Sequence, residues 1–199
     1  IEKIHDTPMV MTAGAFSPPH RGHGTIFKKM LKDAERTGAV PIAAVSKGEG
    51  RTGDVGLTIS EKRKLIETEY PGMQTMGISG FGGIPEVMRG PDGRLIRAKA
   101  GKSKVILGGD RATDSVGAGF RKKGMEVEGV ARDLTSEGMN ATDAISATKV
   151  RKAILEGRTG EARQALDPRI GEILTRPENV NRMNKRAAVI AEKKQKENS

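Results

Sequence analysis

The sequence predicts an α/β protein with a doubly wound parallel sheet, followed by a C-terminal helical extension. Apolar, β-rich runs alternate with helical patterns along most of the 199 residues, and this alternation is typical of parallel strands joined by crossover helices. Aromatic residues make up 3% of the chain and Trp is absent, so aliphatic side chains and Met must form the core. A chain of this length can bury one substantial core.

Three strands and two helices alternate in the first 80 residues. The strands are predicted at 9–13, 40–46 and 73–79, and the helices at about 22–37 and 58–70. Gly38 follows the first helix and is a typical C-terminal breaker. Thr58 and Glu61 have the spacing of a capping box, so the second helix should begin there.

The second half of the chain continues the alternation after an interruption. A basic, glycine-rich segment from about 80 to 103 predicts a long loop or a hairpin. Strands are predicted at 104–108 and 125–131, and another helix begins near residue 145. We therefore expect an α/β domain at 1–158, with 80–103 as an insertion, and a helical extension at 159–199.

The last segment is predicted to be one long helix that starts with a capping box of Thr175 and Glu178. Its narrow apolar stripe consists of Val180, Met183, Ala187 and Ile190. Such a stripe either packs on the helix's own domain or docks to another subunit, which would give a homo-oligomer or a larger assembly.

Charge and composition narrow the classes of function. The net charge of +10 is typical of proteins that bind phosphate-bearing ligands, nucleic acid or anionic lipid. Basic residues gather at 89–104 and 182–196, and this charge is compatible with nucleic-acid binding. Neither segment contains the interleaved aromatic rings that stack single-stranded bases, so no further feature of the sequence supports that function. The absence of Cys excludes disulfides and thiolate catalysis. Because no membrane-length apolar run or signal-peptide pattern is present, we expect a soluble, cytoplasmic protein.

The junction between the first strand and the first helix reads GAFSPPHRGHG, residues 14–24. In doubly wound sheets, ligands bind outside the carboxyl ends of the strands, and a helix start there offers free N–H groups and a positive dipole end to anions. Gly14 would let a phosphate approach the backbone, and Phe16 would anchor the loop in the core. His20 and His23 would share one face and donate hydrogen bonds to a phosphoryl group during its transfer.

This stretch resembles the signature G-x-F-x-P-x-H-x-G-H of the HxGH nucleotidylyltransferase superfamily and meets it at every fixed position. The resemblance implies a Rossmann-like (HUP-type) fold and catalytic roles for His20 and His23. The residues that it implies for nucleotide binding are Gly14, Ala15, Phe16 and Gly22. A zinc site is not expected, because His5 is the only other histidine and cysteine ligands are absent.

Residues 145–151 read ISATKVR and resemble a second signature of the same superfamily, I-S-[ST]-T-x-[IV]-R, at the start of a late helix. Ala147 departs from the signature and removes one hydroxyl donor. The resemblance implies that Ser146, Thr148 and Arg151 hold the β- and γ-phosphates of a nucleoside triphosphate. Hydroxyls and a forked cation at a helix start suit that role.

The stretch ILGGDR, residues 106–111, resembles the family's Gly-x-Asp at a strand end. This implies that Gly108 admits the nucleotide and that Asp110 meets the ribose, although Asp110 alone reads equally as the cap of the next helix. The three motifs resemble cytidylyltransferase-like and nicotinamide mononucleotide (NMN) adenylyltransferase-like members. With the "ARD" around Arg132, the chain looks most like the bacteriophage-encoded branch, for which the compartment would be the host cytoplasm.

The implied reaction transfers a nucleoside monophosphate, AMP from ATP rather than CMP from CTP, to a phosphomonoester such as NMN and releases pyrophosphate. Mg2+ would be carried by the triphosphate, and no metal site on the protein is expected. Lys47, Arg63 and Arg132 are candidates for contact with the acceptor or a phosphate, and the first two also read as solvated surface cations. The basic segment 89–104 would close over the acceptor.

Two other classes of function stay open. The chain would be a non-catalytic nucleotide-binding or structural module of a larger phage protein if the Ala147 departure reflects lost turnover. The retained His20, His23 and Arg151 argue instead for an enzyme. A nucleic-acid-binding protein that uses the two basic segments would bind with an affinity that falls steeply with salt.

Overall fold

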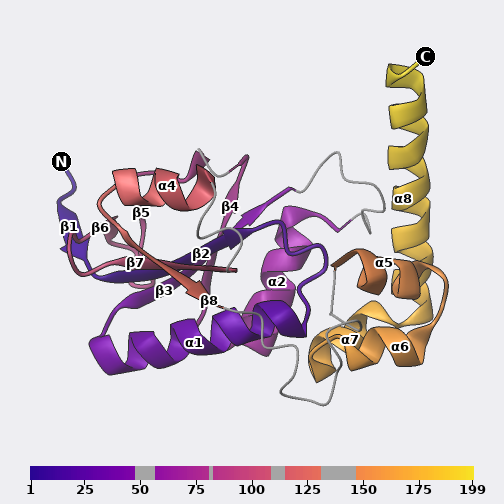
Figure 1. The fold of residues 1–199 in the computed structure, drawn as a ribbon, viewed down its shortest axis with the longest axis horizontal. Coiled ribbons are helices and arrows are strands. Elements are labelled where there is room, and N and C mark those ends of the chain that lie inside the picture. The colour runs from indigo at the N-terminus through magenta and orange to yellow at the C-terminus, as the bar shows by residue number, and fades with distance from the viewer. Residues whose placement is uncertain (48–56, 81–82, 109–114, 131–146) are drawn as a thin grey trace.

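A five-stranded parallel sheet forms the centre of the computed structural model, which describes residues 1–47, 57–80, 83–108, 115–130 and 147–199 (Figure 1). The strand order is β4-β3-β2-β7-β8. The strands are β2 (Met9–Gly14), β3 (Val40–Ser46), β4 (Gln74–Ile78), β7 (Lys104–Gly108) and β8 (Glu126–Val130). The chain winds outward from β2 to β4, returns to the other side of β2 and winds outward again. This is a Rossmann-like, doubly wound α/β fold, as the sequence predicts.

Helices cover both faces of this sheet (Figure 1). On one face, α1 (Arg21–Thr37) and α2 (Ile59–Glu69) pack with alternate strand residues such as Val10 and Ala43 in one hydrophobic cluster. On the other face, α4 (Ser115–Lys122) contributes Phe120 to a second cluster with Met9, Met11 and Leu107. Within the described ranges, none of the helices is both long enough and apolar enough to span a bilayer.

The predicted C-terminus of the first helix and the predicted N-terminus of the second helix are confirmed. Gly38 caps α1 in the left-handed conformation with φ 72°, and its N–H donates to the carbonyl of Ala34. The Thr58 hydroxyl accepts from the Glu61 N–H, and the Glu61 carboxylate accepts from the Thr58 N–H. Both ends are encoded locally, which is why sequence patterns locate them.

The basic segment forms a hairpin, one of the two predicted outcomes, and belongs to a second sheet. Strands β5 (Val87–Arg89) and β6 (Leu95–Ala98) are antiparallel, and β6 also pairs in parallel with β1 (Ile4–Thr7). An ion pair between Arg97 and Asp6, 2.9 Å between nitrogen and oxygen, joins β6 to β1. Strand β1 is absent from the sequence prediction, because its partner in the sheet lies about ninety residues further along the chain.

The described residues 147–199 form four helices: α5 (Ala147–Leu155), α6 (Thr159–Gln164), α7 (Pro168–Leu174) and α8 (Pro177–Glu197). They share a third hydrophobic cluster with α2, which supplies Leu65. Met183 of α8 is fully buried in that cluster. Further along, α8 extends away from the rest of the molecule (Figure 1), and Val189 is 53% exposed. The first part of the predicted stripe therefore packs on its own chain.

The predicted capping box at the start of α8 is wrong. The N-cap residue is Arg176, and no side chain caps the helix. The Thr175 hydroxyl instead donates to the carbonyl of Gly171 and accepts from Nε of Arg163. Pro177 at the first helical position needs no N–H partner, and it moves the helix start one residue past the threonine.

Candidate functional site

The candidate site lies where β2 meets α1, at the point where the strand order reverses. In the described part of the chain, β2 and β7 pair at Val10 with Lys104 and at Met11 with Val105, in the amino-terminal half of β2. Gly14 and Gly108 end these two strands. Ligands of doubly wound sheets bind in the crevice at such a reversal, outside the carboxyl ends of the strands.

Phe16 shapes the loop that leaves β2. Its side chain is buried, and its backbone has a positive φ of 45°. The ring lies against Gly14 so closely that a Cβ at position 14 would approach ring atoms to 3.0 Å. It also meets His23 edge-on, at 4.9 Å between ring centroids, and packs against Phe27 at 5.2 Å. Gly14 thus has a packing role, which makes room for an aromatic ring, in addition to the predicted approach of a phosphate.

The two histidines of the motif stack at the start of α1. Their ring centroids are 3.8 Å apart, with 25° between the planes. Nδ1 of His20 accepts from the Gly22 N–H at 3.0 Å, and Nδ1 of His23 accepts from the His20 N–H at 3.1 Å. A nitrogen that accepts from a backbone N–H carries no proton, so a neutral ring holds its proton on Nε2. Both rings are therefore set to act as donors through Nε2.

The first N–H groups of α1 differ from the expectation that they are free. The Arg21 N–H donates to the carbonyl of Ala165 at 2.9 Å, and the Gly22 N–H donates to His20. Nε of Arg21 also donates to the carbonyl of Leu166. The chain itself thus satisfies the Arg21 donors with the turn after α6 and the Gly22 donor with the His20 ring. The positive end of the helix dipole stays at the junction, but the hydrogen-bonding capacity there lies in side chains.

Arg151 brings the second motif to the first. It lies one turn into α5, its side chain is buried, and one terminal guanidinium nitrogen donates to the carbonyl of Ser17 at 2.8 Å. These two residues are 134 positions apart in the sequence. Thr148 lies in the first turn of the same helix. The predicted site residues Asp110, Arg132 and Ser146, and the side chain of Thr148, lie outside what the structure describes.

Lys62 is a site residue that the sequence analysis missed. Its side chain is completely buried, and Nζ donates to the carbonyls of Ala15 and Ser46 at 2.7 Å each and of Lys47 at 3.3 Å. One ammonium therefore ties the carboxyl ends of β2 and β3 together. A signal for it exists in the sequence, because Lys62 has helical spacing with the buried residue Ile66.

Two other cations predicted for the site, Lys47 and Arg63, lie in different places: Lys47 follows β3 at the junction, and Arg63 bonds to the edge strand β4. Lys47 contributes its carbonyl to the Lys62 ammonium, while its side chain is exposed. Arg63 donates to the hydroxyl and the carbonyl of Thr75 on β4. Thr75 lies two residues before Gly77, which shares a register row with Gly14 through β3. Arg63, a residue of α2, therefore bonds to the edge strand β4.

Gly24, which follows the motif, lies against a buried polar pair. The Tyr70 hydroxyl donates to the carboxylate of Asp167, and a Cβ at position 24 would come closer to that hydroxyl than side chains tolerate. Burial, followed by the hydrogen bond to Asp167, raises the pKa of Tyr70 well above its usual value. The start of α1 is thereby fixed against the end of α2 and the start of α7.

The side chains around the junction suit anionic oxygen better than a metal ion. The imidazoles of His20 and His23 and the guanidinium of Arg151 are N–H donors, whereas the N–H groups of Lys62 are directed to backbone carbonyls and only its positive charge acts at the junction. Across the described ranges, no group of three or more acidic or histidine side chains has the arrangement of a metal site. A phosphate-bearing ligand is therefore the class that this chemistry favours.

The sequence predicts that the basic segment 89–104 closes over the acceptor, and the structure shows where the hairpin in this segment lies. Ile96 and Met88 pack with Met9 and Met11 on the sheet face opposite α1 and α2. The Lys99 N–H donates to the carbonyl of Thr7, just before β2 begins. The hairpin is therefore anchored near the amino end of β2, whereas the histidines lie beyond its carboxyl end.

Comparison with known proteins gives matches among solved structures alone, since no family model and no curated protein matches the sequence. The chain is similar to a macrolide-efflux protein from Streptococcus pneumoniae, with 17% identity and a TM-score of 0.47 over 83% of this chain and 69% of that one. It is also similar to the NadR protein, solved in complex with NAD and AMP-PNP, with 16% identity and a TM-score of 0.44 over 80% of this chain. The chain spans 45% of that NadR structure. At this level of similarity, function has to be argued from the site itself.

Proposed function

We propose that the chain is a nucleotidylyltransferase, which transfers AMP from ATP to a phosphomonoester such as NMN and releases pyrophosphate. The observation that carries the proposal is the stacked pair His20 and His23. Both rings accept a backbone N–H through Nδ1, so the proton of each neutral ring is on Nε2, and Arg151 bonds to the loop that precedes them. Donors and a cation gathered at one strand–helix junction suit phosphoryl chemistry, in which catalysis consists of positioning and neutralising charge.

In the proposed reaction, an oxygen of the acceptor phosphate attacks the α-phosphorus of MgATP in line. The new bond joins that oxygen to the α-phosphorus, and the bond from the α-phosphorus to the bridging oxygen breaks, so that pyrophosphate leaves. Nε2–H groups of His20 and His23 would donate to the α-phosphate and the bridging oxygen as negative charge builds there. Arg151 would neutralise the departing pyrophosphate with its forked donors.

Lys62 acts in this proposal as a positioning residue. Its ammonium draws the carbonyls of Ala15 and Ser46 toward the inside of the junction. A carbonyl that turned outward would place negative partial charge toward the triphosphate, which would oppose binding. Lys62 thus keeps the acceptor atoms of the loop away from the ligand.

The direct test is pyrophosphate release from MgATP or MgCTP with a panel of phosphomonoesters that includes NMN. Wild type is compared with His23→Ala, and His5→Ala serves as the matched control because His5 lies on β1, in the other sheet. We expect His23→Ala to lower turnover by roughly 10²–10³-fold, as removal of a donor to developing charge does elsewhere. His5→Ala should match wild type. Equal turnover in wild type and His23→Ala would contradict the proposal.

One observation favours a second candidate, a nucleotide-binding module without turnover. The N–H groups of Arg21 and Gly22 are bonded within the chain, so these two backbone donors are already used. Such a module would bind ATP, and no acceptor would elicit pyrophosphate. Binding of ATP measured by calorimetry beside the turnover assay distinguishes the two functions.

A further inference from the structure

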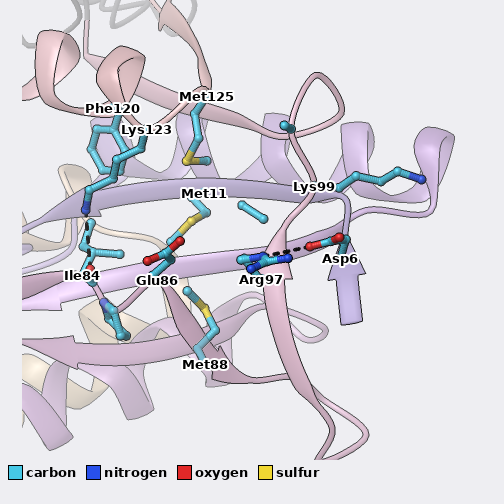
Figure 2. Close-up of a pocket in the computed structure, with 13 residues that line it drawn as sticks. Asp6, Met11, Ile84, Glu86, Met88, Arg97, Lys99, Phe120, Lys123 and Met125 are labelled. Carbon is cyan, nitrogen blue, oxygen red and sulfur yellow. Dashed lines mark hydrogen bonds and ion pairs between the residues drawn. The ribbon is translucent and has the colours of Figure 1, made fainter. Parts of the chain in front are cut away.

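A pocket of about 840 Å³ opens on the sheet face opposite α1 and α2 (Figure 2). Its floor is apolar and buried, and its rim is charged and exposed. The floor consists of Met11, Ile84, Met88, Phe120 and Met125. The charged rim residues are Asp6, Glu86, Arg97, Lys99 and Lys123.

This pocket is separate from the junction at the start of α1. Met11 packs in the cluster on the α4 face, whereas its neighbour Val10 packs in the cluster with α1. Asp6 precedes β2, and Met125 precedes β8, so the pocket lies toward the amino ends of these strands. The histidines follow the carboxyl end of β2. Nothing in the proposed transfer reaction uses the pocket.

The rim cations Arg97, Lys99 and Lys123 form few hydrogen bonds with the described residues. Arg97 donates through Nε to Asp6 at 2.9 Å, and its two terminal nitrogens donate to no other described residue. The Lys99 ammonium likewise has no hydrogen-bond partner among the described side chains and carbonyls, and that of Lys123 reaches only the Ile84 carbonyl, at 3.5 Å. With Asp6 held by Arg97, the positive rim charges outnumber the negative charge of Glu86.

The floor can accept ligands of varied outline. Three of its five side chains are Met, whose unbranched thioether adapts to irregular shapes, and Phe120 adds an aromatic wall. A pocket of this size with an apolar lining and a few polar groups at one side is typical of sites for small organic ligands. The apolar floor selects the body of the ligand, and the cations select its charged group.

We propose that this pocket binds an amphipathic monoanion, with an apolar body on the methionine floor and one carboxylate, phosphate or sulfonate at the basic rim, whose cations Arg97, Lys99 and Lys123 lie around the pocket and raise its positive potential. Glu86 restricts the ligand to one compact anionic group, because a second negative charge would lie near its carboxylate. Figure 2 shows Glu86 and Arg97 on neighbouring sides of the pocket.

The test uses the fluorescent probe 1-anilinonaphthalene-8-sulfonate and its uncharged relative N-phenyl-1-naphthylamine, titrated against the full chain. The double variant Lys99→Gln/Lys123→Gln is compared with Lys102→Gln/Lys122→Gln, which removes two exposed charges next to the pocket but outside its lining. We expect the first variant to bind the sulfonate roughly tenfold more weakly, while the control variant and the binding of the uncharged probe stay unchanged. Glu86→Gln should bind the sulfonate more tightly.

Displacement of the bound sulfonate by decanoate or by decyl phosphate then distinguishes a carboxylate from a phosphate as the preferred group. Circular dichroism of each variant verifies that the fold is unchanged. The proposal is overturned if the native chain binds no sulfonate probe, if both double variants bind it equally, or if MgATP displaces it. The last result would place the probe at the α1 junction.

Discussion

Lys62 places an ammonium group where water does not reach. The full charge is solvated by carbonyls of Ala15, Ser46 and Lys47, which replace the hydrogen bonds that water would provide. Such an arrangement is stable only while the donor and its acceptors are all present, because a buried polar group without a partner is destabilising. The junction therefore depends on one side chain from α2.

We expect Lys62→Met, which keeps an unbranched side chain as far as Cε and removes the ammonium, to lower the free energy of unfolding by about 2–4 kcal/mol through the carbonyls that it leaves unbonded. Lys64→Met on the exposed side of the same helix should stay within about 0.5 kcal/mol of wild type. Urea unfolding curves measure both. Equal midpoints would mean that water or a neighbouring group takes over the three carbonyls.

Tyr70 is the only tyrosine, and the chain has no Trp, so its absorbance reports one site. Burial and the hydrogen bond to Asp167 raise the pKa of the phenol in the folded chain. Unfolding returns that pKa to about 10. Above about pH 10, the folded state thus retains a proton that the unfolded state releases. The contribution of the Tyr70 phenol to the free energy of unfolding is fully present below about pH 10 and decreases as the pH rises further.

Spectrophotometric titration of the native chain should accordingly give no phenolate signal up to the pH at which the protein unfolds. Above about pH 10, wild type should lose up to about 1.4 kcal/mol of stability per pH unit more than Tyr70→Phe, which has no phenol to ionise. Chemical unfolding at a series of pH values measures the difference. Ordinary titration of Tyr70 in the folded state would contradict the burial and bonding described here.

At the scale of single elements, two helical glycines have opposite roles. At Gly24 in α1, the Tyr70 hydroxyl and the Asp167 carboxylate lie close to the position that a Cβ would take. Gly119 in α4 is exposed, and a Cβ there would meet nothing within 4 Å. Because Gly is about 1 kcal/mol less favourable than Ala inside a helix, only close packing gives a reason for Gly24.

Gly119→Ala should therefore raise the free energy of unfolding by about 0.5–1 kcal/mol. Gly24→Ala should lower it, by about 1–3 kcal/mol, because the new methyl displaces the tyrosine from its carboxylate partner. Thermal unfolding of the two variants measures the signs directly. A stabilised Gly24→Ala would show that Tyr70 shifts without losing its hydrogen bond.

The elements that sequence patterns predict well are those with local signals. α1 and α2 are bounded by Gly38 and by the Thr58–Glu61 pair, whose contacts lie within a few residues. β1 has four residues and pairs with β6 far along the chain, so no local pattern marks it. The hydroxyl of Thr175 has the spacing of a cap but bonds to α6 and α7, a tertiary choice that sequence spacing does not encode.

For the candidate site too, some features follow from local sequence patterns and others depend on tertiary contacts. Both histidines and Arg151 are identified by residue type and spacing, and the structure brings Arg151 to the loop that precedes the histidines. The bonds to Nδ1 of each ring, the Ala165 carbonyl at the start of α1 and the buried Lys62 depend on the folded geometry. Motifs thus name the chemistry, and tertiary contacts decide which atoms are available for it.

At the scale of the whole molecule, the third hydrophobic cluster crosses the predicted boundary at residue 158. It joins Leu57 and Leu65 to α5 and to the three helices beyond the boundary, with Met183 of α8 fully buried. Glu61 at the start of α2 also forms ion pairs with Arg182 and Arg186. We infer that the base of α8 stabilises the α/β core, whereas its far end contributes little.

Met183→Ala should lower the free energy of unfolding by about 2–4 kcal/mol, because a buried side chain is replaced by a cavity. Val189→Ala, six residues further along the same helix, should change it by less than about 0.5 kcal/mol. Circular dichroism and tyrosine fluorescence, which report helix content and the Tyr70 region, should change together in one transition. Two separate transitions would mean that α8 unfolds on its own.

The contact between Arg151 and Ser17 and the one between Arg21 and Leu166 span 134 and 145 positions. During synthesis, β2 and α1 leave the ribosome well before α5 and α6, and closing chain segments of such length is slower than forming local structure. A nascent chain that ends before α5 would carry both histidines without the groups that complete their surroundings. Any chemistry at the junction is therefore withheld until α5 and α6 have folded against it.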